Sequence, residues 1–172
     1  MSRFEIIRRW LNESDNWETH DDALERTGFW GTKGAGCIFL AKSRGRILLP
    51  FRSPYVQEGE CWGTWGGAID RGMTPEQAVE NEVKEEAGYK GNFELIPLVV
   101  FKHKTFEYHN FLAIVEEEFE PELNWENDKA EWFEYEEFLN VEPKHNGLKY
   151  LIEHSRNIIE SNVNNIKKSF KK

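Results

Sequence analysis

Three glutamates in one short stretch carry the most distinctive chemistry in the sequence. Glu82, Glu85 and Glu86 are three and four positions apart, and on a helix this spacing places their carboxylates on one face. Such crowded like charges repel one another, so a partner of opposite charge is expected. Hard divalent cations such as Mg²⁺ and Mn²⁺ prefer carboxylate oxygen. The spacing alone also fits a solvated, glutamate-rich surface helix, so the neighbouring residues must decide between the two.

The residues around these glutamates define a loop followed by a helix. The pair Gly66-Gly67 allows the backbone to turn sharply and to aim carbonyl groups inward where a side chain would block them. Thr74 is a suitable N-cap and Pro75 suits the first helical position. Gly88 stands where a left-handed C-cap favours glycine. The sequence therefore predicts a helix that ends at residue 87 and carries all three glutamates.

Together, residues 67–89 resemble the Nudix box, G-x5-E-x7-R-E-U-x-E-E-x-G-U, in which U is an aliphatic residue. The matching positions are Gly67, Glu82, Val83, Glu85, Glu86 and Gly88. Met73 and Asn81 stand where the pattern has its first Glu and its Arg, and Tyr89 stands in place of the last aliphatic residue. In the family these two positions would form a loop-to-helix ion pair, so replacing both leaves no unpaired charge in this chain. Because the metal-facing glutamates and the glycines of the pattern are intact, we expect an active enzyme.

The resemblance implies a hydrolase that cleaves a nucleoside diphosphate linked to another group, with Mg²⁺ or Mn²⁺ as cofactor. Carried onto this chain, Glu82, Glu85 and Glu86 would hold the metal together with the backbone carbonyl of Gly66. The catalytic set would be Glu82, Glu85 and Glu126. In this family the base is either a glutamate of the box or one on a later loop, and Glu126 is the candidate for the later loop. Glu126 fits an ordinary loop acid equally well.

Four residues are the candidates for contacts with the substrate. Arg52 and Lys102 could meet phosphate or ribose, and Gly67 belongs to the glycine loop. Trp65 directly precedes the double glycine and could stack on a base. The substrate is expected to be a small nucleotide, and the sequence does not decide which one.

Two other classes of function stay open at this stage. A Nudix-like module that binds or senses a nucleotide without cleaving it is favoured by the changes at Met73 and Asn81. An acidic interaction domain is the third class, in which the glutamates are only solvated.

The pattern of apolar residues predicts the elements that position these groups. Strands are expected at 34–41, 46–51, 93–102, 106–117 and 131–135, and helices at 3–12, 21–26, 74–87 and 147–166. Interleaved strands and helices indicate a layered α/β domain. The resemblance implies a Nudix-type α/β/α sandwich, with a mixed sheet flanked by helices and a catalytic loop-helix-loop at about 66–89. We expect a single domain over 1–172, with a core at about 34–139, a helical segment at 1–30 and a C-terminal helix at about 146–168.

Length and composition limit the class of protein and the cellular compartment in which it is expected. The chain has 172 residues, of which 39% are hydrophobic, so it is long and apolar enough for one folded domain. Its longest apolar run, 95–101, is far short of the roughly 20 residues of a membrane helix. Two cysteines cannot build a disulfide framework, so a cytoplasmic location is expected.

Charge bears on the partners. The formal net charge is -9, and the positive residues are scattered apart from the terminal KKSFKK, so no stable nucleic-acid complex is expected. We interpret this basic tail as a solvated helix end, with a nucleic-acid tether as the less favoured alternative. A homodimer is left open, because Trp10 and Trp17 could either cover the core or face a second copy.

Overall fold

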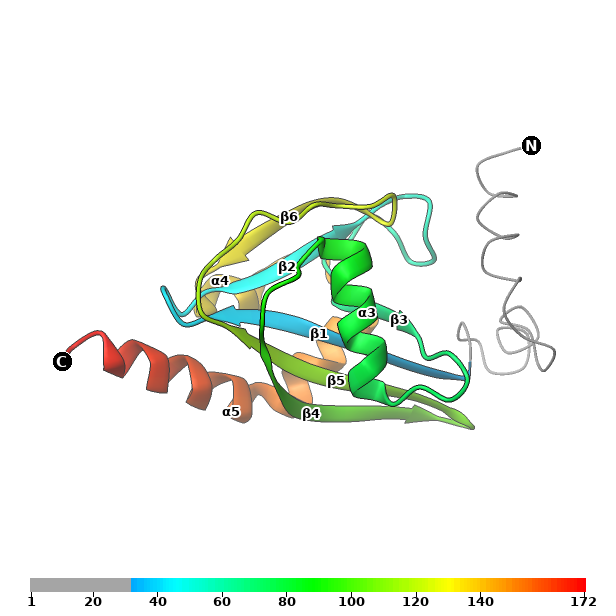
Figure 1. The fold of residues 1–172 in the computed structure, drawn as a ribbon. Helices are drawn as coiled ribbons and strands as arrows, with labels where there is room; N and C mark the ends of the chain where they lie inside the picture. Colours follow the sequence, from blue (N-terminus) through cyan, green and yellow to red (C-terminus); the bar gives the residue numbers. More distant parts are fainter. Residues whose placement is uncertain (1–31) are drawn as a thin grey trace.

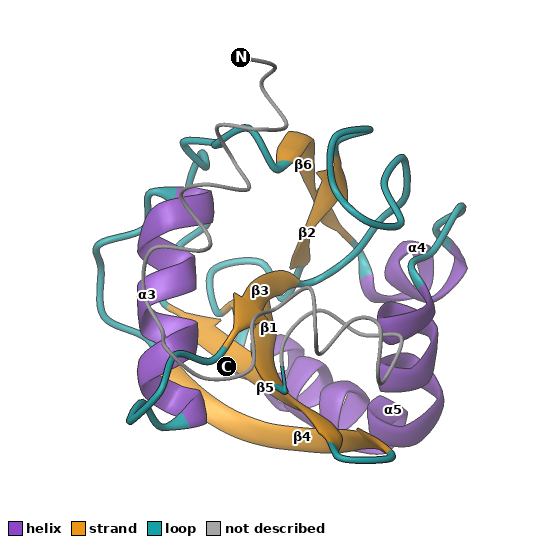
Figure 2. Cartoon of the chain, turned by 90° about the vertical axis from the view of Figure 1, so that its right-hand side faces the viewer, coloured by secondary structure: helices purple, strands orange, loops and turns teal. Residues whose placement is uncertain are grey.

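The computed structural model describes residues 32–172. A six-stranded mixed sheet has the order β4-β5-β1-β2-β6, and β3 pairs with β1 beside this path. β1 runs parallel to β5 and antiparallel to β2 and β3. Helix α3 covers one face, and α4 and α5 cover the other (Figures 1 and 2). This arrangement confirms the predicted sandwich of a mixed sheet between helices.

The bounds of the elements follow the sequence pattern closely. The strands are β1 (Lys33–Ala41), β2 (Ile47–Arg52), β3 (Trp65–Ala68), β4 (Glu94–His103), β5 (Phe106–Val115) and β6 (Asn127–Phe133), and the helices are α3 (Pro75–Ala87), α4 (Tyr135–Asn140) and α5 (Asn146–Ser169). The turn between β1 and β2 uses Gly45 at a φ of 69°, which glycine adopts without strain.

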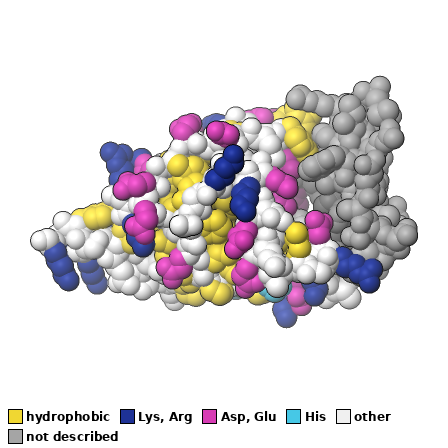
Figure 3. Space-filling model, in the orientation of Figure 1, with side chains coloured by type: hydrophobic (Ala, Val, Ile, Leu, Met, Phe, Trp, Pro, Cys, Tyr) yellow, Lys and Arg dark blue, Asp and Glu magenta, His cyan; other side chains and the backbone are white. Residues whose placement is uncertain are grey.

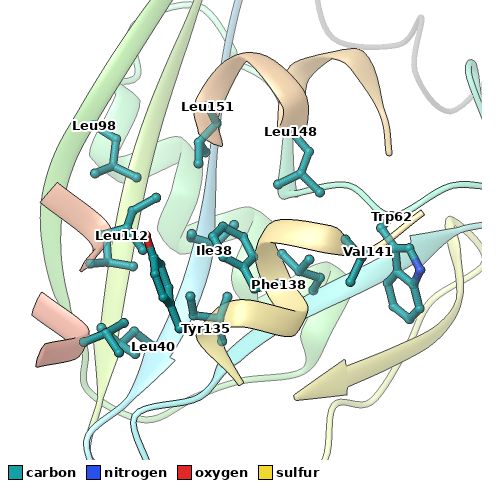
Figure 4. Close-up of a cluster of buried hydrophobic side chains, with 14 of the residues drawn as sticks. Ile38, Leu40, Trp62, Leu98, Leu112, Tyr135, Phe138, Val141, Leu148 and Leu151 are labelled. Carbon is teal, nitrogen blue, oxygen red and sulfur yellow. The ribbon is translucent and has the colours of Figure 1, made fainter. Parts of the chain in front are cut away.

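Large aliphatic and aromatic side chains fill the space between the sheet and α4 and α5. Figure 4 shows side chains of β1, β5 and the two helices meeting in this cluster. Its fully buried members include Ile38, Leu40, Leu112, Phe138, Leu148 and Leu151. Leu148, Leu151, Ile159 and Val163 lie along one side of α5, which is the helical spacing predicted for this segment.

The opposite face packs smaller residues beneath α3. Ala78, Val79, Val83 and Ala87 of α3 are buried against a cluster that contains Ala35, Phe39 and Trp65. Because alanine adds little bulk, the helix can lie close to the sheet. The apolar side of α3 predicted from the spacing is thereby confirmed.

Three features differ from the sequence-based prediction. β3 lies where a loop was expected, because Gly66 approaches the backbone of β1 more closely than a residue with a side chain could. β6 begins at Asn127 rather than at residue 131, and its polar first half lies at an edge of the sheet. The six-residue helix α4 is too short to show helical periodicity. The helices expected at 3–12 and 21–26 lie outside the described residues.

Within residues 32–172, no helix is both long and apolar enough to cross a membrane. On the face shown in Figure 3, acidic and basic side chains are interspersed, and Lys167 and Lys168 belong to the last turn of α5. Cys37 and Cys61 are both buried, and neither forms a disulfide.

Candidate functional site

Helix α3 is anchored at both ends by its own sequence. At its N-terminus the Thr74 side chain accepts a hydrogen bond from the backbone of Gln77, and the Gln77 side chain accepts one from the backbone of Thr74. This reciprocal pair is the capping box. At the other end Gly88 has a φ of 63°, the left-handed conformation predicted for it. The orientation of the glutamate-bearing face therefore follows from local residues.

The three glutamates of α3 lie on one side of the helix at different depths. Glu86 is 2% exposed, Glu82 is half-buried and Glu85 is exposed to solvent. Glu82 and Glu86 are one helical turn apart, and Glu85 is turned about 100° away from Glu86 toward solvent.

The glycine loop meets this face through backbone atoms. The N–H of Gly66 donates to Oε1 of Glu86 at 3.1 Å. A strand residue directs its N–H and C=O groups toward the same edge, so the Gly66 carbonyl also faces this side. A Cβ added to Gly67 would lie 2.6 Å from Oε1 of Glu82. Glycine at position 67 therefore leaves room for the carboxylate of Glu82 in its present position, and a side chain there would force that carboxylate to move.

A fourth carboxylate approaches from the loop before β6. The carbonyl of Glu126 accepts a hydrogen bond from the backbone of Ser53 at 2.8 Å, and its N–H donates to Oδ1 of Asn124 at 3.0 Å. The negative charge of Glu126 contributes to the raised pKa of both Glu82 and Glu86. The structure thus brings the candidate base to the predicted metal-binding glutamates.

Burial and crowding change the protonation of the cluster. Burial, followed by the charge of Glu126, raises the pKa of Glu82 to about 7. The same two causes raise the pKa of Glu86 well above its usual range. The two side chains are hydrogen-bonded to each other, which requires a proton between them. The cluster holds more negative charge than its surroundings balance, as in sites that take up a cation.

The predicted metal ligands are gathered but do not converge on one point. Among residues 32–172, no three His, Cys, Asp or Glu side chains are arranged as a ready metal site. Glu82 and Glu86 face each other, and Glu85 points into solvent. Their oxygen-only donor set nevertheless suits Mg²⁺ or Mn²⁺, which keep several waters. The chemistry of these residues therefore fits such an ion, but the glutamate side chains would have to rotate for their oxygens to converge on it.

The two departures from the Nudix pattern contact each other. Nδ2 of Asn81 lies 3.7 Å from the sulfur of Met73, a weak amide-to-thioether hydrogen bond between helix and loop. Neither side chain leaves a charge unpaired. The loop-to-helix contact expected at these positions is present in neutral form.

Among the residues predicted to bind the substrate, Arg52 has a charge that changes the pKa of a carboxylate in the glutamate cluster. Burial raises the pKa of Glu126, and the guanidinium of Arg52 opposes this shift. The guanidinium is held by the backbone carbonyls of Gln57 and Glu58, to which it donates. It is therefore positioned by main-chain atoms and carries a full positive charge beside the candidate base.

Two other predicted substrate residues lie elsewhere. The expectation that Trp65 stacks on a base is wrong, because its side chain is fully buried and its indole N–H donates to the carbonyl of Leu48. Nζ of Lys102 lies 3.5 Å from Oε1 of Glu107 on the neighbouring strand, so Lys102 pairs there rather than at the glutamate cluster.

Asn127 is a residue of the site that the sequence did not reveal. It is 6% exposed, and its Nδ2 donates to Oε2 of Glu86 at 3.0 Å. The only sequence signal was its position directly after Glu126, since asparagine is common in loops for unrelated reasons.

Comparison with known proteins adds independent information. The NUDIX domain family matches residues 31–154. The chain is 35% identical over 80 residues to "Putative 8-oxo-dGTP diphosphatase 3" of Mycobacterium tuberculosis, covering 44% of this chain and 36% of that protein. It is 32% identical over 123 residues to diphosphoinositol polyphosphate phosphohydrolase 2 of Rattus norvegicus, covering 68% of this chain and 65% of that protein. The matches thus span less than two thirds of either relative.

Solved structures give the same result. The MutT NUDIX hydrolase of Burkholderia pseudomallei is 25% identical, with a TM-score of 0.56, and the match covers 72% of this chain and 97% of that one. RenU, a Nudix hydrolase of M. smegmatis at 23% identity and a TM-score of 0.59, shares the fold. A capped glutamate helix against a glycine strand, within a domain that this family matches over most of the chain, identifies the protein as a member of the Nudix hydrolase family.

Proposed function

We propose that this protein is a metal-dependent hydrolase that cleaves the pyrophosphate linkage of a nucleoside diphosphate joined to another group. The products would be a nucleoside phosphate and a second phosphorylated compound. One observation carries the proposal: Glu82, Glu85, Glu86 and Glu126 gather beside the glycine strand β3, where the N–H of Gly66 donates to Glu86 and Gly67 lies against the carboxylate of Glu82. A purely solvated acidic surface would keep such groups apart and fully hydrated.

The metal would be held by Glu82, Glu85, Glu86 and the carbonyl of Gly66. Support comes from the raised pKa of Glu82 and Glu86, which reflects uncompensated negative charge, and from the direction in which Gly66 faces. When bound, Mg²⁺ or Mn²⁺ would offset the charge of the diphosphate and make the phosphorus more susceptible to attack.

Glu126 is our candidate for the group that accepts a proton from the attacking water. A general base needs a pKa near the working pH, and burial raises the pKa of this side chain in that direction. Its backbone is tied at both its N–H and its carbonyl, so the side chain starts from a fixed point. Glu82 and Glu85 are the alternatives, since each also lies at the cluster.

Charge around the cluster favours a nucleotide over a heavily phosphorylated inositol. The relatives are named for 8-oxo-dGTP and for diphosphoinositol polyphosphates, two substrate classes that differ in their number of phosphates. Arg52 is the cation that counteracts the raised pKa of Glu126, and among residues 32–172 no second cation accompanies it in the groups that most affect the pKa of Glu82, Glu86 or Glu126. Several phosphates would need several such partners. We therefore propose a nucleoside triphosphate or a small nucleotide conjugate.

A binding module without catalysis is the second candidate. The replacement of the charged pair by Met73 and Asn81 favours it, because a neutral contact holds the loop more weakly than an ion pair with good geometry. Such a module would bind a nucleotide and release it unchanged.

A substrate panel separates these candidates. The protein would be incubated with Mg²⁺ or Mn²⁺ and with normal and oxidised nucleoside triphosphates, ADP-ribose, dinucleoside polyphosphates and a diphosphoinositol polyphosphate, and the products would be resolved by chromatography. A hydrolase forms product with at least one nucleotide. A binding module gives only a ligand-dependent rise in melting temperature. If the protein gives neither of these two responses, the result would support an acidic interaction domain.

A matched pair of variants ties any activity to the site. Glu85→Gln should lower turnover by about 10²–10⁴-fold, the range that positioned acid–base groups contribute. Glu80→Gln changes an exposed glutamate of the same helix and should keep the unaltered rate. Equal activity in both variants would show that the proposed site is wrong.

A further inference from the structure

The carboxylate of Glu86 is held at both oxygens by neutral donors. Oε1 accepts from the backbone N–H of Gly66 at 3.1 Å, and Oε2 accepts from Nδ2 of Asn127 at 3.0 Å. These donors belong to β3 and β6, whereas Glu86 belongs to α3. Three elements therefore meet at one side chain that is 2% exposed.

Two donors restrict the orientation of a carboxylate without using up its capacity to bind. A glutamate side chain has three rotatable bonds, and an ionised carboxylate offers about four lone-pair sites. One of these two donors at each oxygen fixes the plane of the group and leaves further lone pairs, which in the metal-free protein also meet Glu82. Those lone pairs stay available for a cation.

The choice of asparagine matters because its amide donates without carrying charge. A lysine or arginine at position 127 would neutralise Glu86 and repel a divalent cation. An aspartate would add a repelling charge to the Glu86 carboxylate. Asn127 is 6% exposed, so its amide is not exchanging this contact freely with water.

Asn127 also follows Glu126 directly and is the first residue of β6, where it is paired with Arg52. A contact that ties Asn127 to Glu86 therefore ties the chain bearing the candidate base to the helix bearing the metal ligands. Without it, the loop before β6 and the C-terminal half of α3 would lose a direct side-chain link.

We propose that Asn127 is a positioning residue, whose amide orients Glu86 for a divalent cation and fixes the chain at Glu126 relative to helix α3. This inference rests on the proposed function, because it assigns a role toward the same metal. Asn127 itself is not assigned contact with the substrate or the metal.

The test measures metal binding apart from catalysis. Asn127→Leu removes the donor with little change in volume, and Asn140→Leu removes an amide that donates to a backbone carbonyl on the exposed side of α4. Mn²⁺ alone would be titrated into each metal-free protein by calorimetry. We expect binding to weaken by about 10–100-fold for Asn127→Leu, the usual effect of losing a group that orients a metal ligand. The Asn140→Leu variant should match the unaltered chain.

Two further measurements distinguish positioning from a structural role. In Asn127→Leu, half-maximal activity should need more Mn²⁺ by the same factor as the loss in binding, while the rate at saturating Mn²⁺ falls less. In a Glu86→Gln background, Asn127→Leu should have no further effect on Mn²⁺ binding, because the oriented ligand is already lost. A merely structural residue would lower stability in both backgrounds alike.

A measurement on the unaltered chain covers the case in which the variants fail to fold. The side-chain amide resonance of Asn127 should shift when Mg²⁺ is added, whereas that of Asn140 should not. A folded Asn127→Leu with unchanged Mn²⁺ affinity, or an unmoved Asn127 resonance at saturating Mg²⁺, would overturn the positioning role alone. If the unaltered chain bound neither ion, both this inference and the proposed function would fail.

Discussion

The two faces of the sheet differ in what they bury. Beneath α4 and α5 the cluster consists of large aliphatic and aromatic side chains such as Leu148 and Phe138. Beneath α3 it contains five buried alanines, and Glu86 is buried on the same helix as its valines. Each buried methylene group contributes about 0.8 kcal/mol. The α5 face thus supplies more stability per residue, and the α3 face uses some of it to hold carboxylates away from water.

This difference shows how the fold separates two requirements. A helix that carries buried like charges is destabilised by them, so the rest of the domain must tolerate the loss. The small residues under α3 also bring Glu86 within reach of Gly66. Variants on the α5 face should therefore change mainly the free energy of unfolding, and variants on the α3 face should change mainly the catalytic activity.

The largest effect on stability is expected from Leu148→Ala on the α5 face. Leu148 is fully buried, and removing it should lower the free energy of unfolding by about 2–5 kcal/mol. Denaturant unfolding measures this loss. At temperatures where the variant is folded, kcat/KM for the best nucleotide should stay unchanged. A fall in kcat/KM of the folded variant would show that the two faces are not independent.

Gly67→Ala makes the opposite test on the α3 face. The new Cβ would lie 2.6 Å from Oε1 of Glu82, so the carboxylate must move. A misplacement of this size lowers kcat/KM by about 100-fold. The melting temperature should change little, because Glu82 can turn toward solvent. Unaltered activity in this variant would mean that the position of Glu82 is not critical.

The pH dependence of stability should also originate on the α3 face. Because the pKa of Glu82 rises from 4.5 in its usual state to about 7 on folding, the folded protein holds a proton that the unfolded chain releases. Stability from this group is present at low pH and is lost as pH rises. The loss between pH 5 and pH 7 is about 2 kcal/mol in the metal-free protein.

Glu82→Gln should reduce this pH dependence to the part that comes from Glu86, whose pKa is also raised, and Glu80→Gln should leave it in place. Urea unfolding of the three proteins at several pH values makes the comparison. Mn²⁺ should reduce the loss in the unaltered chain, because a cation replaces the proton as the partner of the carboxylates. A Glu82→Gln variant with the same pH slope as the unaltered chain would contradict the assignment.

The smallest expected effect concerns the neutral pair between loop and helix. Met73→Glu combined with Asn81→Arg should restore an ion pair at the surface, worth about 0.2–1 kcal/mol beyond the sum of the single changes. A double-mutant cycle by thermal unfolding measures this coupling. Zero coupling would indicate that the two positions do not meet in solution, despite the 3.7 Å contact.

Much of the fold could be predicted because local signals were strong. Thr74 and Gly88 define the ends of α3, and apolar runs define β1 and β5. β3 could not be predicted, because glycine has a low strand propensity and Gly66 is in a strand only through its close approach to β1. Its pairing depends on tertiary contacts that no local pattern records.

The site could be predicted in part, for those of its residues that lie close together in the sequence. Helical spacing places Glu82 and Glu86 together, since both positions belong to one element. The contact of Asn127 with Glu86 joins residues 41 positions apart, and no period in the sequence connects them. The burial of Trp65 was equally hidden, because an aromatic residue beside a glycine loop suits a core position as well as a binding position.

The direction of α3 has a consequence of its own. Glu85 and Glu86 lie in the last turn of this helix, at the negative end of the helix dipole. The helix dipole therefore adds to the repulsion among the carboxylates, whereas the opposite direction would have relieved it. A cation at this end would offset the helix dipole as well as the side-chain charges, so it would add to the Gly88 cap in keeping the final turn of α3 folded.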